Sequence, residues 1–137
     1  MIAHFKFCFA AESVNNEFMA LDIEIDKALQ SVKVSENFIV DIDINLPADI
    51  LFHLSKRKDN DTIVKDDKIV ADKFIKLESL EIDGFFVHGW QLPDDKCLFE
   101  TADNTVSTVY WARNGTARLI IDNDDPALWL LDCPKII

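Results

Sequence analysis

Glycine and cysteine are both scarce in this sequence, and long apolar runs are absent. The 137 residues include three glycines and three cysteines. Cys8, Cys97 and Cys133 are odd in number and have no CxxC spacing, which excludes a complete disulfide framework and a zinc knuckle. No run approaches the roughly 18 to 20 apolar residues of a membrane helix, and residues 1–11 lack the basic and apolar segments of a signal peptide. We therefore expect a soluble protein with no membrane partner. It would reside in the cytoplasm or in an assembly made there, and would not be secreted through a signal peptide.

Positive charge is scarce as well. Aspartate and glutamate total 25 against 14 lysines and arginines, which gives a net charge of −11. Such a chain repels polyanions, so we expect no nucleic-acid partner. With 137 residues and a hydrophobic content of 49%, the chain is long enough for one domain with a core and too short for two, so residues 1–137 are predicted to form a single domain. The same net charge suggests one alternative function, a small acidic inhibitor that imitates nucleic acid.

Apolar residues recur at every second position in many short runs, which is the pattern of half-buried β-strands. These runs are residues 5–9, 21–25, 38–44, 50–54, 62–64, 74–82, 85–90, 106–111, 117–121 and 128–131. Because each sheet must bury one face, the pattern predicts an all-β fold, an antiparallel two-sheet β-sandwich or jelly roll of roughly nine to eleven strands. Residues 26–32 are the best candidate for a short helical turn, and the charged residues 55–73 are predicted to form an exposed loop and an edge strand.

Two dipeptides, Asp83-Gly84 and Asn114-Gly115, are strong hairpin signals because both central positions of a type I′ turn need a positive φ. The first hairpin would pair Ile82 with Phe85 and Leu80 with Val87 on its core side. On its other side Ser79 would face His88.

The second hairpin would place an indole between two guanidinium groups. Pairing Trp111 with Arg118, and Arg113 with Thr116, puts Trp111, Arg113 and Arg118 on the face opposite the buried one. Such a group is either an exposed cation–π stack that stiffens the ribbon or a flat platform for a ligand ring. Both interpretations remain open at this point.

Motifs for catalysis are missing, since the chain contains no GxSxG, Walker, GxGxxG or HExxH pattern. Ser79 and His88 would lie opposite each other, but no third catalytic member or oxyanion loop is evident, so we expect a non-enzymatic protein without a cofactor. The acidic loops at residues 59–61 and 122–125 offer oxygen atoms of the kind that calcium binds. They do not match the EF-hand pattern and are interpreted as solvated turns, so no metal site is expected.

The segment at residues 50–57 reads Ile-Leu-Phe-His-Leu-Ser-Lys-Arg, and alternation along a strand places His53, Ser55 and Arg57 on one face. Galectin-type lectins carry His, Asn and Arg at alternating positions of one strand, where they hydrogen-bond a galactoside, and a Trp stacks on the sugar. Residues 38–64 resemble the central strands of that family. Ser55 stands where the family has Asn, and the family's Trp-Gly-x-Glu segment does not follow at the usual distance. The resemblance implies the same sandwich architecture.

The pattern favours a non-catalytic interaction module, and one form of it binds a glycan. Three tryptophans in a small β domain with polar strand faces motivate this hypothesis. Trp111 or Trp90 would stack on a sugar ring. His53, Arg57 or Arg113 would hydrogen-bond the sugar hydroxyls.

The other form is a structural or assembly module, for example a virion or appendage component. Its sheet edges and loops would contact a protein partner or further copies of the chain. The apolar residues 128–131 and 136–137 fit such contacts. The sequence does not separate the two forms, because both need the same scaffold.

Overall fold

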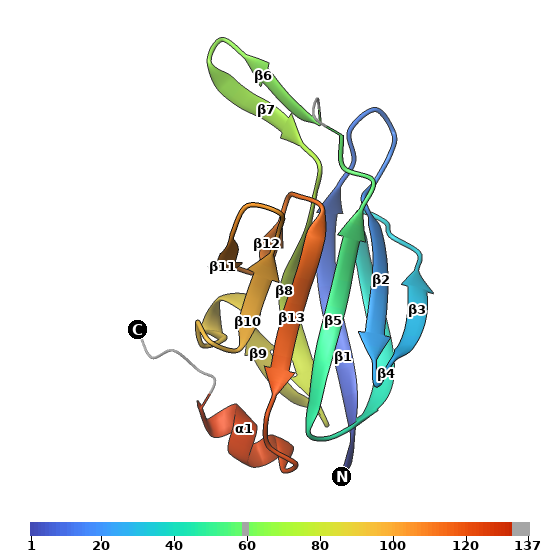
Figure 1. The fold of residues 1–137 in the computed structure, drawn as a ribbon, viewed down its shortest axis with the longest axis vertical. Helices are drawn as coiled ribbons and strands as arrows, with labels where there is room; N and C mark the ends of the chain where they lie inside the picture. Colours follow the sequence, from blue (N-terminus) through green and yellow to red (C-terminus); the bar gives the residue numbers. More distant parts are fainter. Residues whose placement is uncertain (59–60, 133–137) are drawn as a thin grey trace.

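Two antiparallel sheets pack face to face in the computed structural model, which describes residues 1–58 and 61–132 (Figure 1). The five-stranded sheet has the order β12-β8-β1-β4, with β9 also paired to β8, and the six-stranded sheet has the order β11-β10-β13-β5-β2-β3. This arrangement confirms the predicted all-β sandwich class. Cys133 and residues 59–60 and 136–137, which entered the predictions above, lie outside the described residues.

The elements have the following bounds. The five-stranded sheet contains β1 (Ile2–Glu12), β4 (Asn37–Asn45), β8 (Phe74–Ile82), β9 (Phe85–His88) and β12 (Tyr110–Trp111). The six-stranded sheet contains β2 (Ala20–Ile25), β3 (Ala28–Val32), β5 (Ala48–Ser55), β10 (Cys97–Glu100), β11 (Thr105–Ser107) and β13 (Gly115–Ile121). The remaining elements are β6 (Thr62–Lys65), β7 (Lys68–Asp72), the short 3₁₀ helix η1 (Gly89–Gln91) and α1 (Pro126–Asp132).

Aromatic rings fill the space between the two sheets. Phe5, Phe7 and Phe9 of β1 point inward at alternate positions and are almost fully buried. Phe52 of the facing β5 meets Phe7 edge-on, with ring centroids 5.5 Å apart, and Trp111 stacks on Phe52 at 5.3 Å. These offset and edge-on contacts are the arrangements that aromatic pairs prefer, so this aromatic core contributes strongly to the stability of the sandwich.

The predicted Asp83-Gly84 hairpin is confirmed. Asp83 and Gly84 have φ values of 50° and 86°, as a type I′ turn requires. The register pairs Leu80 with Val87, and both side chains are buried. Phe85 was expected on the same core side, but it is 63% exposed because it lies next to the turn, at the end of the sandwich.

The predicted Asn114-Gly115 hairpin is wrong. Trp111 pairs with Ile75 in the five-stranded sheet, whereas β13 pairs with β5 and β10 in the six-stranded sheet. The chain therefore crosses from one sheet to the other at this point, and neither Asn114 nor Gly115 has a positive φ. Glycine is needed at 115 for a different reason, because a Cβ there would lie 2.3 Å from the carbonyl oxygen of Glu100.

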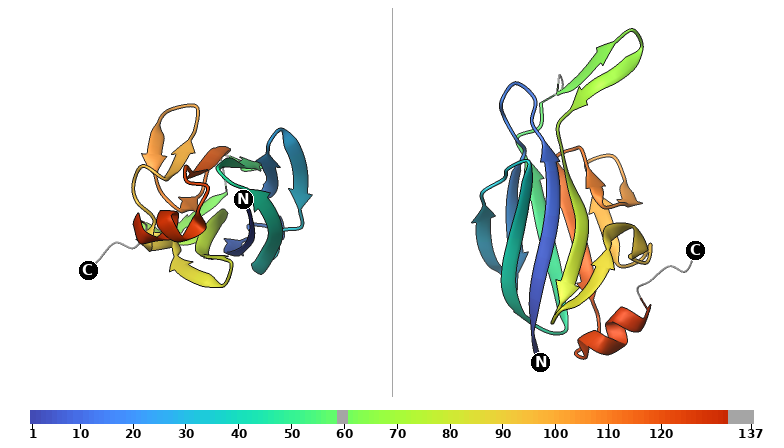
Figure 2. Two further views of the ribbon diagram at one scale, coloured as in Figure 1. Left: turned by 90° about the horizontal axis from the view of Figure 1, so that it is seen from below. Right: turned by 180° about the vertical axis from the view of Figure 1, so that it is seen from behind.

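Strands β6 and β7 form a two-stranded ribbon, called here the arm, which extends beyond one end of the sandwich (Figures 1 and 2). Residues 55–73 were predicted as a loop and an edge strand, and the second strand of this ribbon was missed. At the base of the arm, Lys73 Nζ lies 2.8 Å from Asp61 Oδ2, and both side chains are buried. Burial alone would lower the pKa of Lys73, but hydrogen bonds to Asp61 and Glu17 outweigh it and raise that pKa.

Two further segments differ from the sequence prediction. Residues 26–32, predicted as a helical turn, contain a turn with positive φ at Asp26 and Lys27, followed by β3. Residues 128–131, predicted as a strand, belong to α1. This helix starts at Pro126, and the Asp125 carboxylate accepts a hydrogen bond from the Ala127 amide at 2.9 Å. Among the described residues, no helix is long and apolar enough to cross a membrane.

Candidate functional site

Three aromatic side chains form an exposed strip at the edge of the five-stranded sheet. Phe86, His88 and Trp90 alternate along β9 and η1, and Phe86 and Trp90 are 52% and 50% exposed. The Phe86 ring meets His88 edge-on at 4.7 Å, and His88 stacks on Trp90 at 5.8 Å with 16° between the rings. We call these three residues the aromatic strip. Because half of each large ring faces solvent, the strip adds less to stability than a buried ring would and is available to a ligand.

The backbone at Gly89 fixes the position of Trp90. A Cβ at Gly89 would lie 2.2 Å from the carbonyl oxygen of Leu77, so only glycine lets the chain approach β8 this closely. The His88 amide donates a hydrogen bond to Gln91 Oε1 at 2.9 Å, and the Leu92 amide donates to the Gly89 carbonyl at 3.2 Å. The indole is therefore held on a short, close-packed turn.

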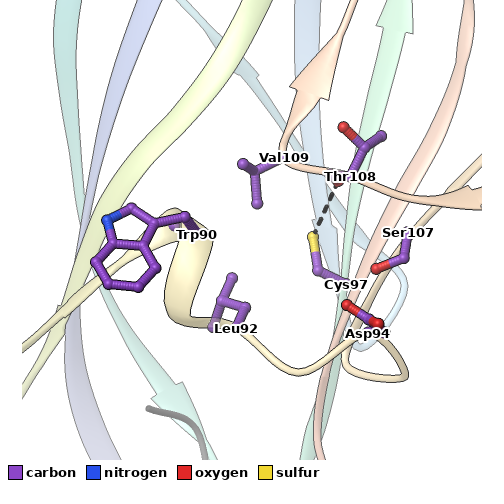
Figure 3. A pocket seen from close by; sticks show the side chains of 8 residues that line it. Trp90, Leu92, Asp94, Cys97, Ser107, Thr108 and Val109 are labelled. Carbon is purple, nitrogen blue, oxygen red and sulfur yellow. Dashed lines mark hydrogen bonds between the residues drawn. The ribbon is translucent and has the colours of Figure 1, made fainter. Parts of the chain in front are cut away.

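A pocket of about 200 Å³ lies beside Trp90 (Figure 3). Its apolar lining includes Leu92 and Val109, and its polar lining includes Asp94, Ser107 and Thr108. These residues come from three segments: η1, the connection from η1 to β10, and the end of β11 with the connection to β12. The pocket thus combines an apolar wall, a carboxylate and two hydroxyls, and the exposed Trp90 indole lies beside it, turned away from Asp94, Ser107 and Thr108 (Figure 3).

Cys97 also lines this pocket and has the properties of a structural thiol. Its Sγ donates to the carbonyl oxygen of Thr108 at 3.6 Å, and the same oxygen accepts a hydrogen bond from the Trp111 indole at 3.0 Å. Burial raises the pKa of the Cys97 thiol to about 12. The group therefore stays protonated at neutral pH and lacks the thiolate that a nucleophile or a metal ligand needs.

A second polar surface lies on the outer face of the six-stranded sheet. His53 Nδ1 lies 3.0 Å from Thr116 Oγ1, and His53 Nε2 lies 3.1 Å from Glu24 Oε1. Thr116 and Arg118 border a hollow of about 290 Å³, and Arg118 is ion-paired to Asp49. The structure thus brings two of the predicted site residues, His53 and Arg118, to one face.

Arg57 does not share that face, so this part of the prediction is wrong. Strand β5 ends at Ser55, and Lys56 turns the chain with a φ of 69°, which breaks the alternation. The Arg57 guanidinium points into the base of the arm, where it lies 2.8 Å from Asp72 and 2.6 Å from Thr62 Oγ1. Its backbone exchanges hydrogen bonds with the side chain of Asn114.

Trp111 is not an exposed platform, which corrects the expectation based on the second hairpin. Its side chain is 0% exposed and lies in the aromatic core, because β12 joins the five-stranded sheet with Trp111 facing inward. Arg113 and Arg118 do not flank it; they pair with Asp103 and Asp49 instead. Arg113 and Arg57 do come together along a cleft of about 400 Å³.

Of the predicted ligand residues, Trp90 is thus the tryptophan that reaches solvent, since Trp111 and Trp129 are buried. Sequence reasoning missed Phe86 as a partner of Trp90, and it assigned His88 only to a position opposite Ser79. The alternation of Phe86, His88 and Trp90 along the chain was a visible signal for the strip. In the part of the chain that the structure describes, no group of three or more His, Cys, Asp or Glu side chains is placed to hold a metal ion.

Comparison with known proteins gives a likeness of fold. No family model and no curated protein matches the sequence. Among solved structures, the selenomethionine form of vCBM60 matches with a TM-score of 0.52 at 6% identity, covering 86% of this chain and 90% of that one. It is described as part of an evolutionary link, by circular permutation, between two families of calcium-dependent carbohydrate-binding modules. The complex of vCBM60 with galactobiose matches with a TM-score of 0.50 at 5% identity, covering 85% and 97%.

Proposed function

We propose that this protein is a non-catalytic carbohydrate-binding module and that the pocket beside Trp90 holds a sugar ring. The observation that carries the proposal is a half-exposed Trp90 indole next to a pocket that Asp94, Ser107 and Thr108 also line. Sugar rings have apolar C–H faces and a rim of hydroxyls, so an aromatic ring with nearby carboxylate and hydroxyl groups suits both parts of the ligand.

The size of the pocket points to a small ligand. Its volume of about 200 Å³ is below the roughly 300–1,000 Å³ typical of drug-sized ligands. One sugar ring would fill it, and a neighbouring ring of the same glycan would extend along the aromatic strip over His88 and Phe86. Binding of this kind is weak for a single ring, so we expect millimolar to micromolar dissociation constants.

The likeness to vCBM60 supports the proposal at the level of architecture, since a sandwich of similar shape carries a glycan in the galactobiose complex. At 5% identity the ligand of that protein does not transfer residue by residue. We therefore place the site here on the exposed side chains of this chain.

Affinity electrophoresis through gels that contain different polysaccharides, followed by calorimetry with the oligosaccharide of the best one, tests the proposal. Retardation of the wild-type protein should disappear in Trp90→Ala. The matched control is Ile39→Ala, which removes a large apolar side chain that is 58% exposed on β4, at the other side of the same sheet. No retardation by any polysaccharide, or equal retardation of Trp90→Ala and the wild type, would contradict the proposed site.

The outer face of the six-stranded sheet is the second location where a glycan would find hydrogen-bonding groups. His53→Ala removes the group that links Thr116 and Glu24 there. We expect this variant to bind the glycan as the wild type does. Loss of binding in His53→Ala, with binding retained in Trp90→Ala, would move the site to this face and agree with the galectin-like interpretation of His53.

An acidic inhibitor that imitates nucleic acid remains the alternative function. It requires an uncompensated run of carboxylates, whereas ion pairs such as Lys6–Glu81 and Lys96–Asp122 neutralise part of the acidic surface. Displacement of a nucleic acid from a basic DNA-binding domain by this protein at physiological salt would favour the alternative.

A further inference from the structure

The arm carries apolar side chains that the described part of the chain leaves largely exposed. Val64, Ile69 and Val70 near its tip are 56%, 68% and 54% exposed. Strands β6 and β7 pair only with each other, and the views in Figures 1 and 2 agree that the ribbon extends away from the sandwich. A two-stranded ribbon is at best marginally stable in water. Exposed β-branched residues on it are therefore a feature that a partner, rather than the fold, would explain.

The base of the arm is built to hold it in one direction. Lys73 and Asp61 form a buried ion pair at 2.8 Å, and Arg57 pairs with Asp72 at 2.8 Å. The Tyr110 hydroxyl donates to the second oxygen of Asp72 at 3.1 Å. These bonds lie where the ribbon meets the sandwich, so the tip is presented at a fixed distance beyond the sheets and less entropy is lost when it binds.

The opposite end of the molecule offers an apolar groove. Phe85, Ala127, Leu130 and Leu131 line a space of about 260 Å³ between the β8–β9 turn and α1. Phe85 and Leu131 are 63% and 78% exposed. In Figures 1 and 2, α1 lies at one end of the long axis and the arm at the other, so the arm cannot reach the groove of its own chain.

The charges near the two surfaces are complementary. Lys65 and Lys68 pair directly across the arm, and among the described residues neither has an ion-pair partner. Two like charges opposite each other weaken an isolated ribbon. At the groove, Asp83 precedes Phe85 and Asp124 precedes α1, and both are exposed.

We propose that the arm of one copy docks into the groove of a second copy, so that the chain associates head to tail. Val64 and Ile69, which face each other across the ribbon, enter the groove, and Lys65 and Lys68 meet Asp83 and Asp124. Such an interface is heterologous and joins copies into a ring or a filament, depending on the rotation from one copy to the next. The contact is small, so we expect a dissociation constant on the order of 100 µM.

Light scattering across a concentration series tests the association. The wild-type mass should rise with concentration, and both Ile69→Asp and Leu131→Asp should weaken association at least roughly tenfold. The matched control is Leu29→Asp, which changes a leucine that is 62% exposed on the edge strand β3 and should associate as the wild type does. A wild type that stays monomeric up to about 1 mM, well above the expected dissociation constant, would overturn the proposal.

Mixing the two defective variants tests whether arm meets groove. Ile69→Asp retains an intact groove and Leu131→Asp retains an intact arm, so together they should form one-to-one dimers that grow no further. If copies associated arm to arm or groove to groove, the mixture would associate no more strongly than the variants do separately, and this result would overturn the proposal. The proposal would also be overturned if the wild type bound neutral lipid vesicles without associating with itself, and if Ile69→Asp abolished that binding. Binding of the Ile69→Asp variant to glycans should be unchanged, which separates this test from that of the Trp90 site.

Discussion

The aromatic core and the aromatic strip use the same kinds of ring in opposite ways. Phe52 and Trp111 are fully buried between the sheets, whereas Phe86 and Trp90 are about half exposed at the sheet edge. Rings removed from water contribute most of their transfer free energy to the fold. Rings left in water contribute little, although they too pack against one another at 4.7 to 5.8 Å through His88. The core rings therefore serve stability, whereas the rings of the strip remain accessible to the ligand proposed above.

Phe52→Ala, a substitution in the aromatic core, should have the largest effect on stability. The Phe52 ring contacts Phe7, Phe9 and Trp111, so its removal leaves a cavity at the centre of the sandwich. We expect a loss of about 4 kcal/mol in the free energy of unfolding, measured by urea denaturation. Phe86→Ala removes the same ring from the strip and should cost less than about 0.5 kcal/mol. Equal losses of stability in the two variants would contradict the distinction between the aromatic core and the aromatic strip.

Gly89→Ala tests the place where core and strip meet. The new Cβ would collide with the Leu77 carbonyl oxygen, so η1 and Trp90 have to shift away from β8. We expect a loss of about 2 kcal/mol in stability together with a changed tryptophan emission spectrum. In the control Gly84→Ala, the new Cβ meets open space at a positive φ. That variant should lose about 1 kcal/mol and keep the wild-type emission.

Acid should destabilise a third region, the base of the arm, more than it destabilises the core. Burial would raise the pKa of Asp61 and of Asp72, but hydrogen bonds from Lys73 and Arg57 outweigh it and hold both values below the usual 3.8. Because these pKa values are lower in the folded protein, their stabilisation is present above about pH 4 and is lost as the pH falls through the folded-state values. Between pH 6 and pH 3, amide exchange in residues 62–72 should lose protection at least roughly tenfold more than in β1. Parallel loss in both regions would show that the arm does not depend on these carboxylates.

Trp90→Ala has the smallest expected effect on stability. We expect its free energy of unfolding to stay within about 0.5 kcal/mol of the wild type, because half of the indole is already in water. A loss comparable to that of Phe52→Ala would show that Trp90 is a structural residue and would remove the main support for a ligand site.

Much of the fold could be predicted from the sequence because alternation is a local property. The strands around Phe7, Phe52 and Leu80 and the turn at Asp83-Gly84 followed from patterns within a few residues. The pairing of Trp111 with Ile75 could not be predicted in this way, since those residues are far apart in the chain. Local turn signals favoured a hairpin there that the sheets do not form.

The scarcity of glycine also hid several turns. Among the residues that the structure describes, positive φ falls on Asp, Asn and Lys at eight positions, including Asp26, Lys27, Asp66 and Asp67, and on Gly84 alone among the glycines. Part of the acidic composition therefore serves tight turns, where Asp and Asn tolerate the left-handed conformation. At the candidate site, the exposure of Trp90 depends on the close approach of Gly89 to Leu77. No motif in the sequence predicts this contact.

Tryptophan fluorescence titration with the oligosaccharide selected by affinity electrophoresis tests the central claim most directly. Trp111 and Trp129 are buried, so a ligand that stacks on the strip should change the emission of Trp90. We predict a saturable shift in the wild type that disappears in Trp90→Phe, with the emission of the two buried indoles unchanged. A saturable shift that persists in Trp90→Phe, or no shift at millimolar concentration of any glycan tested, would contradict a sugar-binding site at Trp90.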